Sequence, residues 1–180
     1  VAELDGLRRR SERATATRRA ACPIFWTLGG NQVGRGALSG WEEVIRPAVL
    51  AGASLWPFDG SLSKLAERNG IVLAETYPAE AYGHVGVRFD SRQSKRRQSD
   101  RKAHADTLFD WAKSRGVMLE DDAATEIADG FGANLTGEDR FDAMVGLLGM
   151  IEVVIGARAE APLLPPETRW EGWIMGHADD

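Results

Sequence analysis

The stretch from Thr136 to Gly156, TGEDRFDAMVGLLGMIEVVIG, constrains the fold more than any other part of the chain. After its opening acidic residues it is apolar at almost every position. A helix that is apolar on nearly all sides is a buried helix, and about twenty helical residues span roughly 30 Å, the width of a small domain. We therefore expect a buried helix over 136–156 around which the rest of the chain packs.

Two carboxylates open this expected helix. Asp139 and Asp142 are three residues apart and so share a face. Gly146 and Gly149 follow on the face of Asp142, which predicts that another backbone packs closely there. Asp139 is equally typical of a capping box with Thr136, so it is either a cap or a site residue. Asp142 lies deeper among apolar neighbours, where an unpaired charge would be costly.

The totals indicate one globular domain over residues 1–180, because 180 residues suffice for a sizeable core. A net charge of -5 does not favour nonspecific nucleic-acid binding, so any such contact must use a local basic patch. The sequence contains no free run of about 18 apolar residues, so it predicts no membrane span. The single cysteine, Cys22, excludes an internal disulfide and is consistent with a reducing, cytoplasmic location.

The first forty residues carry arginines and then glycines. Residues 2–21 are expected to be helical, with arginines that either contact phosphates or form a solvated face. The glycine-dense stretch 22–41 is expected to be a loop anchored by Phe25, Trp26 and Leu28. Alternatively, this stretch binds a ligand, with Asn31 and Gln32 as the candidate binding residues. No phosphate-loop or GxGxxG motif is present.

A third carboxylate lies in GIVLAETYPAEAY, residues 70–82. The apolar run Ile71–Tyr77 predicts a buried strand, and Pro78 predicts a helix over 79–85. Glu75 sits near the end of this strand, where open α/β sheets place their ligand sites. The alternative is that Glu75 forms a salt bridge with one of the many arginines.

Residues 88–102 form the dense basic cluster of this acidic chain. Lys95, Arg96 and Arg97 are its candidate phosphate contacts, and a solvated loop is the alternative.

The remaining elements are a short edge strand at 54–58 and a tail in which Trp170, Trp173 and Ile174 return to the core. Further helices are expected over 40–51 (with Pro47 shortening or kinking it), 61–68, 100–115 and 121–129.

Glu75, Asp139 and Asp142 together suggest metal chemistry. Mg²⁺ and Mn²⁺ prefer carboxylate oxygens. Two such ions can activate a water and stabilise the leaving oxygen of a phosphodiester.

Five blocks carry a resemblance to a known family: FWTLGGNQVG, LWPFDG, AETYPAEAY, EDRFDAMVGLLGM and EGWIMG. Together they resemble domain-of-unknown-function family 429, predicted nucleases of the RNase H-like, RuvC-like superfamily. The resemblance implies an α/β fold of the RNase H type, helix-rich, with a short sheet and a buried C-terminal helix. It further implies a metal-dependent nuclease that uses Glu75, Asp139 and Asp142 with Mg²⁺ or Mn²⁺ on nucleic acid.

One departure from that superfamily concerns its first strand, which carries a further aspartate. Before Cys22 this chain offers only Asp5. The chain is therefore expected to be the C-terminal part of an RNase H-like domain, either truncated or divergent at its start. A non-catalytic binding or scaffold module, using FWTLGGNQVG or the basic loop for a partner, is the alternative function.

Overall fold

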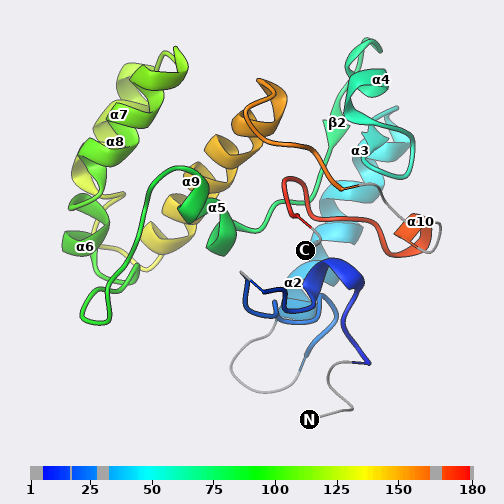
Figure 1. Cartoon of the computed structure of the whole chain (residues 1–180), viewed down its shortest axis with the longest axis horizontal. Helices are drawn as coiled ribbons and strands as arrows, with labels where there is room; N and C mark the ends of the chain where they lie inside the picture. Colours follow the sequence, from blue (N-terminus) through cyan, green and yellow to red (C-terminus); the bar gives the residue numbers. More distant parts are fainter. Residues whose placement is uncertain (1–5, 17, 28–32, 163–167, 179–180) are drawn as a thin grey trace. The chain divides into compact units, whose positions relative to one another are not determined.

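The computed structural model describes residues 6–16, 18–27, 33–162 and 168–178. The chain forms two compact units (Figure 1), of which the first is Val1–Glu75 with Ala159–Asp180 and the second is Thr76–Arg158. The structure is helix-rich with a short two-stranded parallel sheet, so the expected α/β class is confirmed. Two compact units can belong to one domain, so the single domain over 1–180 stays a prediction.

The sheet of the first unit is a small βαβ arrangement. Strand β1 (Ser54–Leu55) pairs in parallel with β2 (Val72–Leu73), and α4 (Leu62–Ala66) connects them. Glu75 continues the line of β2 through an isolated parallel bridge to Ile174. The edge strand at 54–58 is thus confirmed in shorter form, and the strand expected over 71–77 is regular at only two residues. Parallel pairing brings the C-terminal segment beside Glu75.

A helical stretch in the first unit starts earlier than expected. It comprises α2 (Val33–Gly40), the π-helical turn η2 (Trp41–Ile45) and α3 (Arg46–Leu50). The prediction of a loop over 22–41 is therefore wrong from residue 33 onward. Pro47 has no N–H for the helical ladder, and wider π turns are one way in which a helix accommodates such a break. Pro47 accordingly lies just after the π turn and does not end the helix.

The helix expected over residues 2–21 is wrong for the described part of that range. Only the 3₁₀ turn η1 (Arg10–Glu12) forms there. The arginines bind backbone carbonyls, with Arg8 Nε 3.0 Å from Ala21 O and Arg18 Nη1 2.7 Å from Ser11 O. These bonds fold the segment back on itself, which a straight helix could not do.

The core of the first unit receives part of the expected tail. Trp173 and Ile174 are buried as expected, but Trp170, in α10 (Thr168–Glu171), is 77% exposed. Phe25 is also exposed, so it does not anchor the glycine-rich stretch, and Leu28 lies outside the described residues. Among the described residues of this unit, the buried core contains Ala21, Trp56, Leu65, Trp173, Ile174 and Met175.

The second unit is built on the helix that the sequence singles out. Helix α9 (Gly137–Val154) confirms the expected element, and α5 (Pro78–His84) packs against it. A Cβ added to Gly149 would lie 2.8 Å from the Cβ of Ala81, so the close approach predicted for this face is confirmed. Phe141 and Val145 of α9 are fully buried in the core of the unit.

The other helices of the second unit are α6 (Gln98–Lys102), α7 (Ala105–Arg115) and α8 (Asp121–Asp129). The predicted helix over 121–129 is confirmed, and the single helix expected over 100–115 is wrong because the chain turns at 103–104. The turn follows Arg101, whose buried guanidinium binds the carbonyls of Lys95, Gly130 and Gly132. Arg101 thereby ties α6 to the loop that precedes α9.

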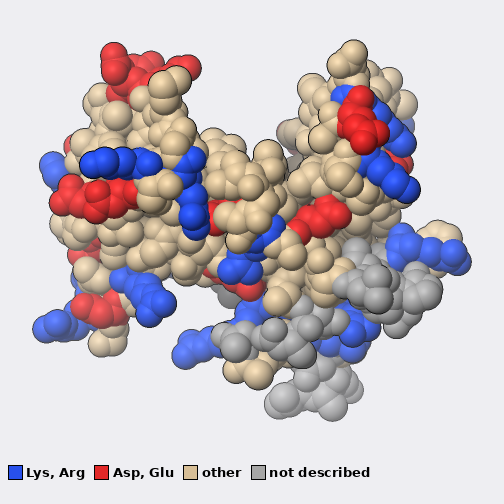
Figure 2. Space-filling view, turned by 45° about the horizontal axis from the view of Figure 1, so that its top comes forward, with Lys and Arg blue, Asp and Glu red and all other residues tan. Residues whose placement is uncertain are grey.

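The surface carries both signs of charge. On the face shown in Figure 2, lysines and arginines are interspersed with aspartates and glutamates. Within the described ranges, no helix combines the length and the apolar character needed to cross a bilayer.

Candidate functional site

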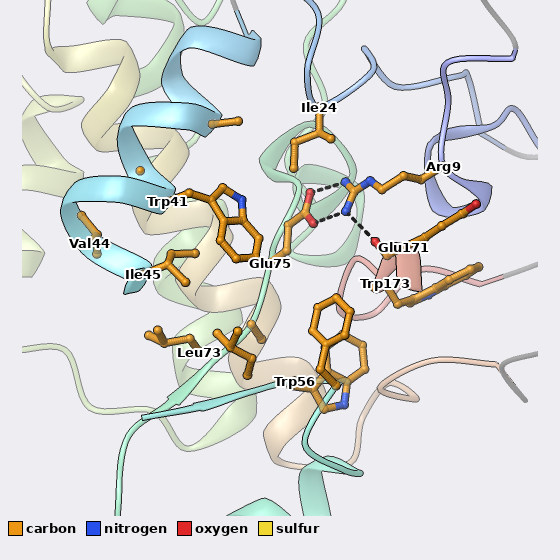
Figure 3. A pocket seen from close by; sticks show the side chains of 16 residues that line it. Arg9, Ile24, Trp41, Val44, Ile45, Trp56, Leu73, Glu75, Glu171 and Trp173 are labelled. Atoms are coloured by element: carbon orange, nitrogen blue, oxygen red, sulfur yellow. Dashed lines mark hydrogen bonds and ion pairs between the residues drawn. The ribbon is translucent and has the colours of Figure 1, made fainter. Parts of the chain in front are cut away.

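Glu75 is held by an arginine of the same unit. Its two carboxylate oxygens accept hydrogen bonds from Nη1 and Nη2 of Arg9, both at 2.7 Å (Figure 3). The Glu75 side chain is 36% exposed and that of Arg9 is 15% exposed. The ion pair with an arginine, one of the two sequence interpretations of Glu75, is therefore the arrangement that the structure shows.

A second carboxylate holds Arg9 from behind. Buried Glu12 accepts from Nε of Arg9 at 2.9 Å and from the backbone N–H of Arg9 and of Ile24. Burial lowers the pKa of Arg9, but the hydrogen bonds and charges of Glu75 and Glu12 outweigh it and raise that pKa above its ordinary value. The guanidinium is therefore a fixed positive charge between two carboxylates.

A pocket of about 450 Å³ opens beside this pair, entirely within the first unit. Figure 3 shows the Glu75 carboxylate between the Trp41 indole and the Arg9 guanidinium. The remaining walls of the pocket are mostly apolar and come from the helical stretch 33–50, the two strands and the C-terminal segment. The aromatic lining residues are Trp41, Trp56, Phe58 and Trp173.

Hydrogen bonds fix two of the three indoles. Trp56 Nε1 donates to Glu160 Oε2 at 3.1 Å, and Glu160 also accepts the backbone N–H of Leu62. Trp173 Nε1 donates to the carbonyl of His177 at 3.1 Å. Because both N–H groups are used by the protein, these indoles present hydrocarbon and π surface to the pocket.

The acidic start of α9 forms a separate cluster in the second unit. Asp142 accepts a hydrogen bond from the Tyr82 hydroxyl and forms an ion pair with Lys95, whose Nζ lies 2.6 Å from Oδ2. Glu138 lies 3.1 Å from the same ammonium group. Burial lowers the pKa of Lys95, but Asp142 and Glu138 outweigh it and raise that pKa; burial and Asp142 also raise the pKa of Tyr82.

The three predicted phosphate contacts pair with other groups of the protein to different extents. Lys95 is bound by the acidic cluster, and Arg97 is paired with Asp100 at 2.6 Å and bound to the carbonyl of Arg92. Arg96 is 84% exposed and lies 3.7 Å from Glu138. Of the three, Arg96 is therefore the side chain most open to a partner.

The predicted metal ligands fall in different units. Glu75 belongs to the first unit, whereas Asp142 and the exposed Asp139 belong to the second. Glu138, and not Asp139, shares the Lys95 ammonium group with Asp142. Asn31 and Gln32, the other predicted site residues, lie outside the described residues.

The oxygens of Glu75 and Asp142 already have donors within the protein. Both oxygens of Glu75 accept from Arg9, and those of Asp142 accept from Tyr82 and Lys95. Within the described ranges, no group of three or more His, Cys, Asp or Glu side chains is placed to hold a metal ion. Metal binding by Glu75, Asp139 and Asp142 stays a prediction.

Sequence reasoning missed the tryptophan-lined pocket and most partners of the acidic groups. Trp41 and Trp56 fall in the helix predicted over 40–51 and the edge strand predicted at 54–58, and neither prediction places them at a pocket. Glu138 carried a usable signal, because it lies one turn before Asp142 on the same face of a helix. Arg9 carried none, since nothing distinguishes it from the neighbouring arginines.

Comparison with known proteins gives no relative: no family model, no curated protein and no solved structure matches the chain. The resemblance to family 429 therefore stays a prediction.

Proposed function

We propose that the chain is a binding module whose first unit holds a small organic ligand in the tryptophan-lined pocket. The observation that carries this proposal is the pocket itself, about 450 Å³ and walled by three indoles and a phenyl ring. Small-molecule sites have volumes of roughly 300 to 1,000 Å³ and mostly apolar walls with a few polar groups. The ion pair of Arg9 and Glu75 supplies such polar groups.

Binding is better supported than hydrolysis because two of the predicted catalytic carboxylates already have cationic partners within the protein. Arg9 forms an ion pair with Glu75, and Lys95 forms one with Asp142. Breaking either pair to admit a metal ion would leave a partly buried cation without its partner, which is costly. An RNase H-like fold and a cytoplasmic location are part of this proposal; the first is supported by the five sequence blocks, and the second by the single cysteine.

The test uses indole as a neutral probe and fluorotryptophan-labelled protein observed by fluorine NMR. Binding is expected to shift the signals of Trp41, Trp56 and Trp173, which line the pocket, and not that of Trp111, which lies in the second unit. Single Trp→Phe variants assign the signals.

Two glycines of α2 offer a matched pair of variants. A Cβ added at Gly36 or Gly40 meets nothing within 4 Å, but only Gly40 lines the pocket. Gly40→Leu is expected to abolish the indole shifts and Gly36→Leu to preserve them. Indole shifts that survive Gly40→Leu, or no shifts at millimolar indole, would reject the proposal.

A metal-dependent nuclease is the second candidate, favoured by one observation. Glu138 and Asp142 hold the ammonium ion of Lys95 between them, so this turn of α9 already binds a cation. Under this candidate, the protein cleaves nucleic acid with Mg²⁺ or Mn²⁺, and Asp142→Asn abolishes the cleavage while Asp110→Asn, at an exposed site on α7, does not. Wild-type protein without metal-dependent cleavage would remove this candidate.

A further inference from the structure

We propose that the ligand of the tryptophan-lined pocket is an organic cation, an amine or quaternary ammonium group on a compact apolar body. This inference rests on the proposed binding function and names the class of ligand.

The charges around the pocket carry the first step. The charged lining residues are one arginine and two glutamates: Arg9, Glu75 and Glu171. Glu12 adds a further carboxylate directly behind Arg9. The pocket therefore has an excess of negative charge, which favours a cationic ligand over an anionic one.

The positive charge of Arg9 does not offer an anion site. Its Nη1 donates to Glu75 and to the carbonyl of Glu171, its Nη2 contacts Glu75 and Glu12, and its Nε donates to Glu12. A guanidinium has five N–H groups in a planar fork, and these contacts use all of its directions. An anion in the pocket would therefore face carboxylate oxygens without an unused N–H group of Arg9 to bind it.

The indoles carry the second step. A cation is attracted to the face of a tryptophan ring within about 6 Å of its centre. Trp41 and Glu75 both line the pocket (Figure 3), so an ammonium group bound in it has a π face and a carboxylate within the same site. The Trp56 N–H is hydrogen-bonded to Glu160, which places another carboxylate at the edge of that ring.

The apolar walls decide which cations fit. A small inorganic cation keeps strongly held water and gains nothing from hydrocarbon walls. Alkylated ammonium groups are weakly hydrated and carry apolar surface, so they can gain from burial and from cation–π contact together. Aromatic side chains are the usual surroundings of quaternary ammonium ligands in proteins.

The experiment compares three probes of nearly equal shape by fluorine NMR of the labelled full chain. The probes are choline, its uncharged carbon isostere 3,3-dimethylbutan-1-ol, and the anion 3,3-dimethylbutanoate. Choline is expected to bind at least tenfold more tightly than the alcohol, and the anion more weakly than both. Its affinity should also fall as NaCl is raised, because salt screens partly exposed charges.

A pair of charge variants tests the role of the carboxylate. Glu75→Gln is expected to weaken choline binding at least fivefold and to leave the alcohol unchanged. Glu67→Gln, at an exposed glutamate that does not line the pocket, is expected to change neither. Glu171→Gln is the second variant should Glu75→Gln alter the Trp56 signal of the free protein.

The outcomes separate the two proposals. Equal affinity for choline and the alcohol, with indole still bound, rejects the cationic ligand and leaves the binding function. Tighter binding of the anion rejects it as well. Failure of indole and all three probes to shift any pocket signal rejects the binding function and this inference with it.

Discussion

Glu152 is a buried carboxylate in the apolar part of α9. It accepts hydrogen bonds from Trp111 Nε1 at 2.6 Å and from Arg115 Nε at 2.7 Å. Burial raises the pKa of Glu152, but the bonds from Arg115 and Trp111 and the nearby positive charge outweigh it and lower that pKa below its ordinary 4.5. The ionised form of Glu152 therefore stabilises the second unit.

Replacing this carboxylate tests that conclusion. Glu152→Gln is expected to lower the free energy of unfolding of the second unit by about 2 kcal/mol, since bonds to a buried charged group are lost or weakened. Glu126→Gln is the matched control, because Glu126 pairs with Arg140 on the surface and such pairs contribute about 1 kcal/mol or less. Urea unfolding followed by the fluorine signal of Trp111 measures both, and equal effects would contradict the expectation.

The same residue predicts a pH dependence. A carboxylate whose pKa is lower in the folded state stabilises fully above its unfolded value, and this stabilisation is lost as pH falls through the folded value. The stability that Glu152 contributes is thus expected to decline below about pH 4.5. A plot of the urea midpoint against pH should be shallower in this range for Glu152→Gln than for the wild type, and identical slopes would exclude this role.

Glu152 and Glu75 differ in how much the sequence reveals about their surroundings. A glutamate between Ile151 and Val153 in an apolar helix was a visible signal for a buried, paired charge. The partner of Glu75 was not visible, because Arg9 lies 66 residues away and has arginine neighbours on both sides. Periodicity indicates which side chains are buried, but the pairing of charges depends on tertiary contacts that local patterns do not encode.

At the scale of elements, the contact between α5 and α9 depends on glycine. The Cβ that Gly149→Ala adds would lie 2.8 Å from the Cβ of Ala81, so one helix must move. We expect overpacking to lower the free energy of unfolding by about 2 kcal/mol. The better helix propensity of alanine offsets about 1 kcal/mol of this loss. Thermal or urea unfolding of the variant measures the net effect.

Gly83 provides the control on the other helix of this contact. A Cβ at Gly83 of α5 meets nothing within 4 Å, so Gly83→Ala is expected to stabilise the second unit by up to about 1 kcal/mol. Opposite signs for the two alanine variants would support the close contact. A stabilising Gly149→Ala would show that the helices are further apart than the structure has them.

Elements with strong local signals were predictable. Pro78 marked the start of α5, and a continuous apolar run marked α9. The segment 2–21 was not predictable because its conformation is set by arginine side chains that bind backbone carbonyls. Helix α2 was missed because its glycines favour a loop by propensity.

At the scale of the whole molecule, the two units have separate cores. Trp173 is 1% exposed in the first unit, and the core around Phe141 belongs entirely to the second. Trp173→Ala is expected to cost the first unit about 3 to 5 kcal/mol, since a large buried aromatic side chain is removed. The fluorine signal of Trp56 should then report unfolding at lower urea, while that of Trp111 stays at its wild-type midpoint.

An exposed tryptophan of the same segment is the control. Trp170→Ala is expected to change the midpoint of either unit by little, within about 0.5 kcal/mol, as surface substitutions usually do. If Trp173→Ala moved both midpoints together, the chain would unfold as one cooperative body.

The return of the C-terminal segment to the first unit has a consequence for synthesis on the ribosome. Glu75 is made early, but its backbone partner Ile174 and the Glu171 carbonyl that contacts Arg9 are made nearly a hundred residues later. Translation proceeds at roughly 5 to 20 residues per second, so this delay lasts several seconds or more. The second unit is complete before the first can close. The first unit therefore closes only after the second has been made, and the indoles of Trp41 and Trp56 stay accessible to chaperones during that interval.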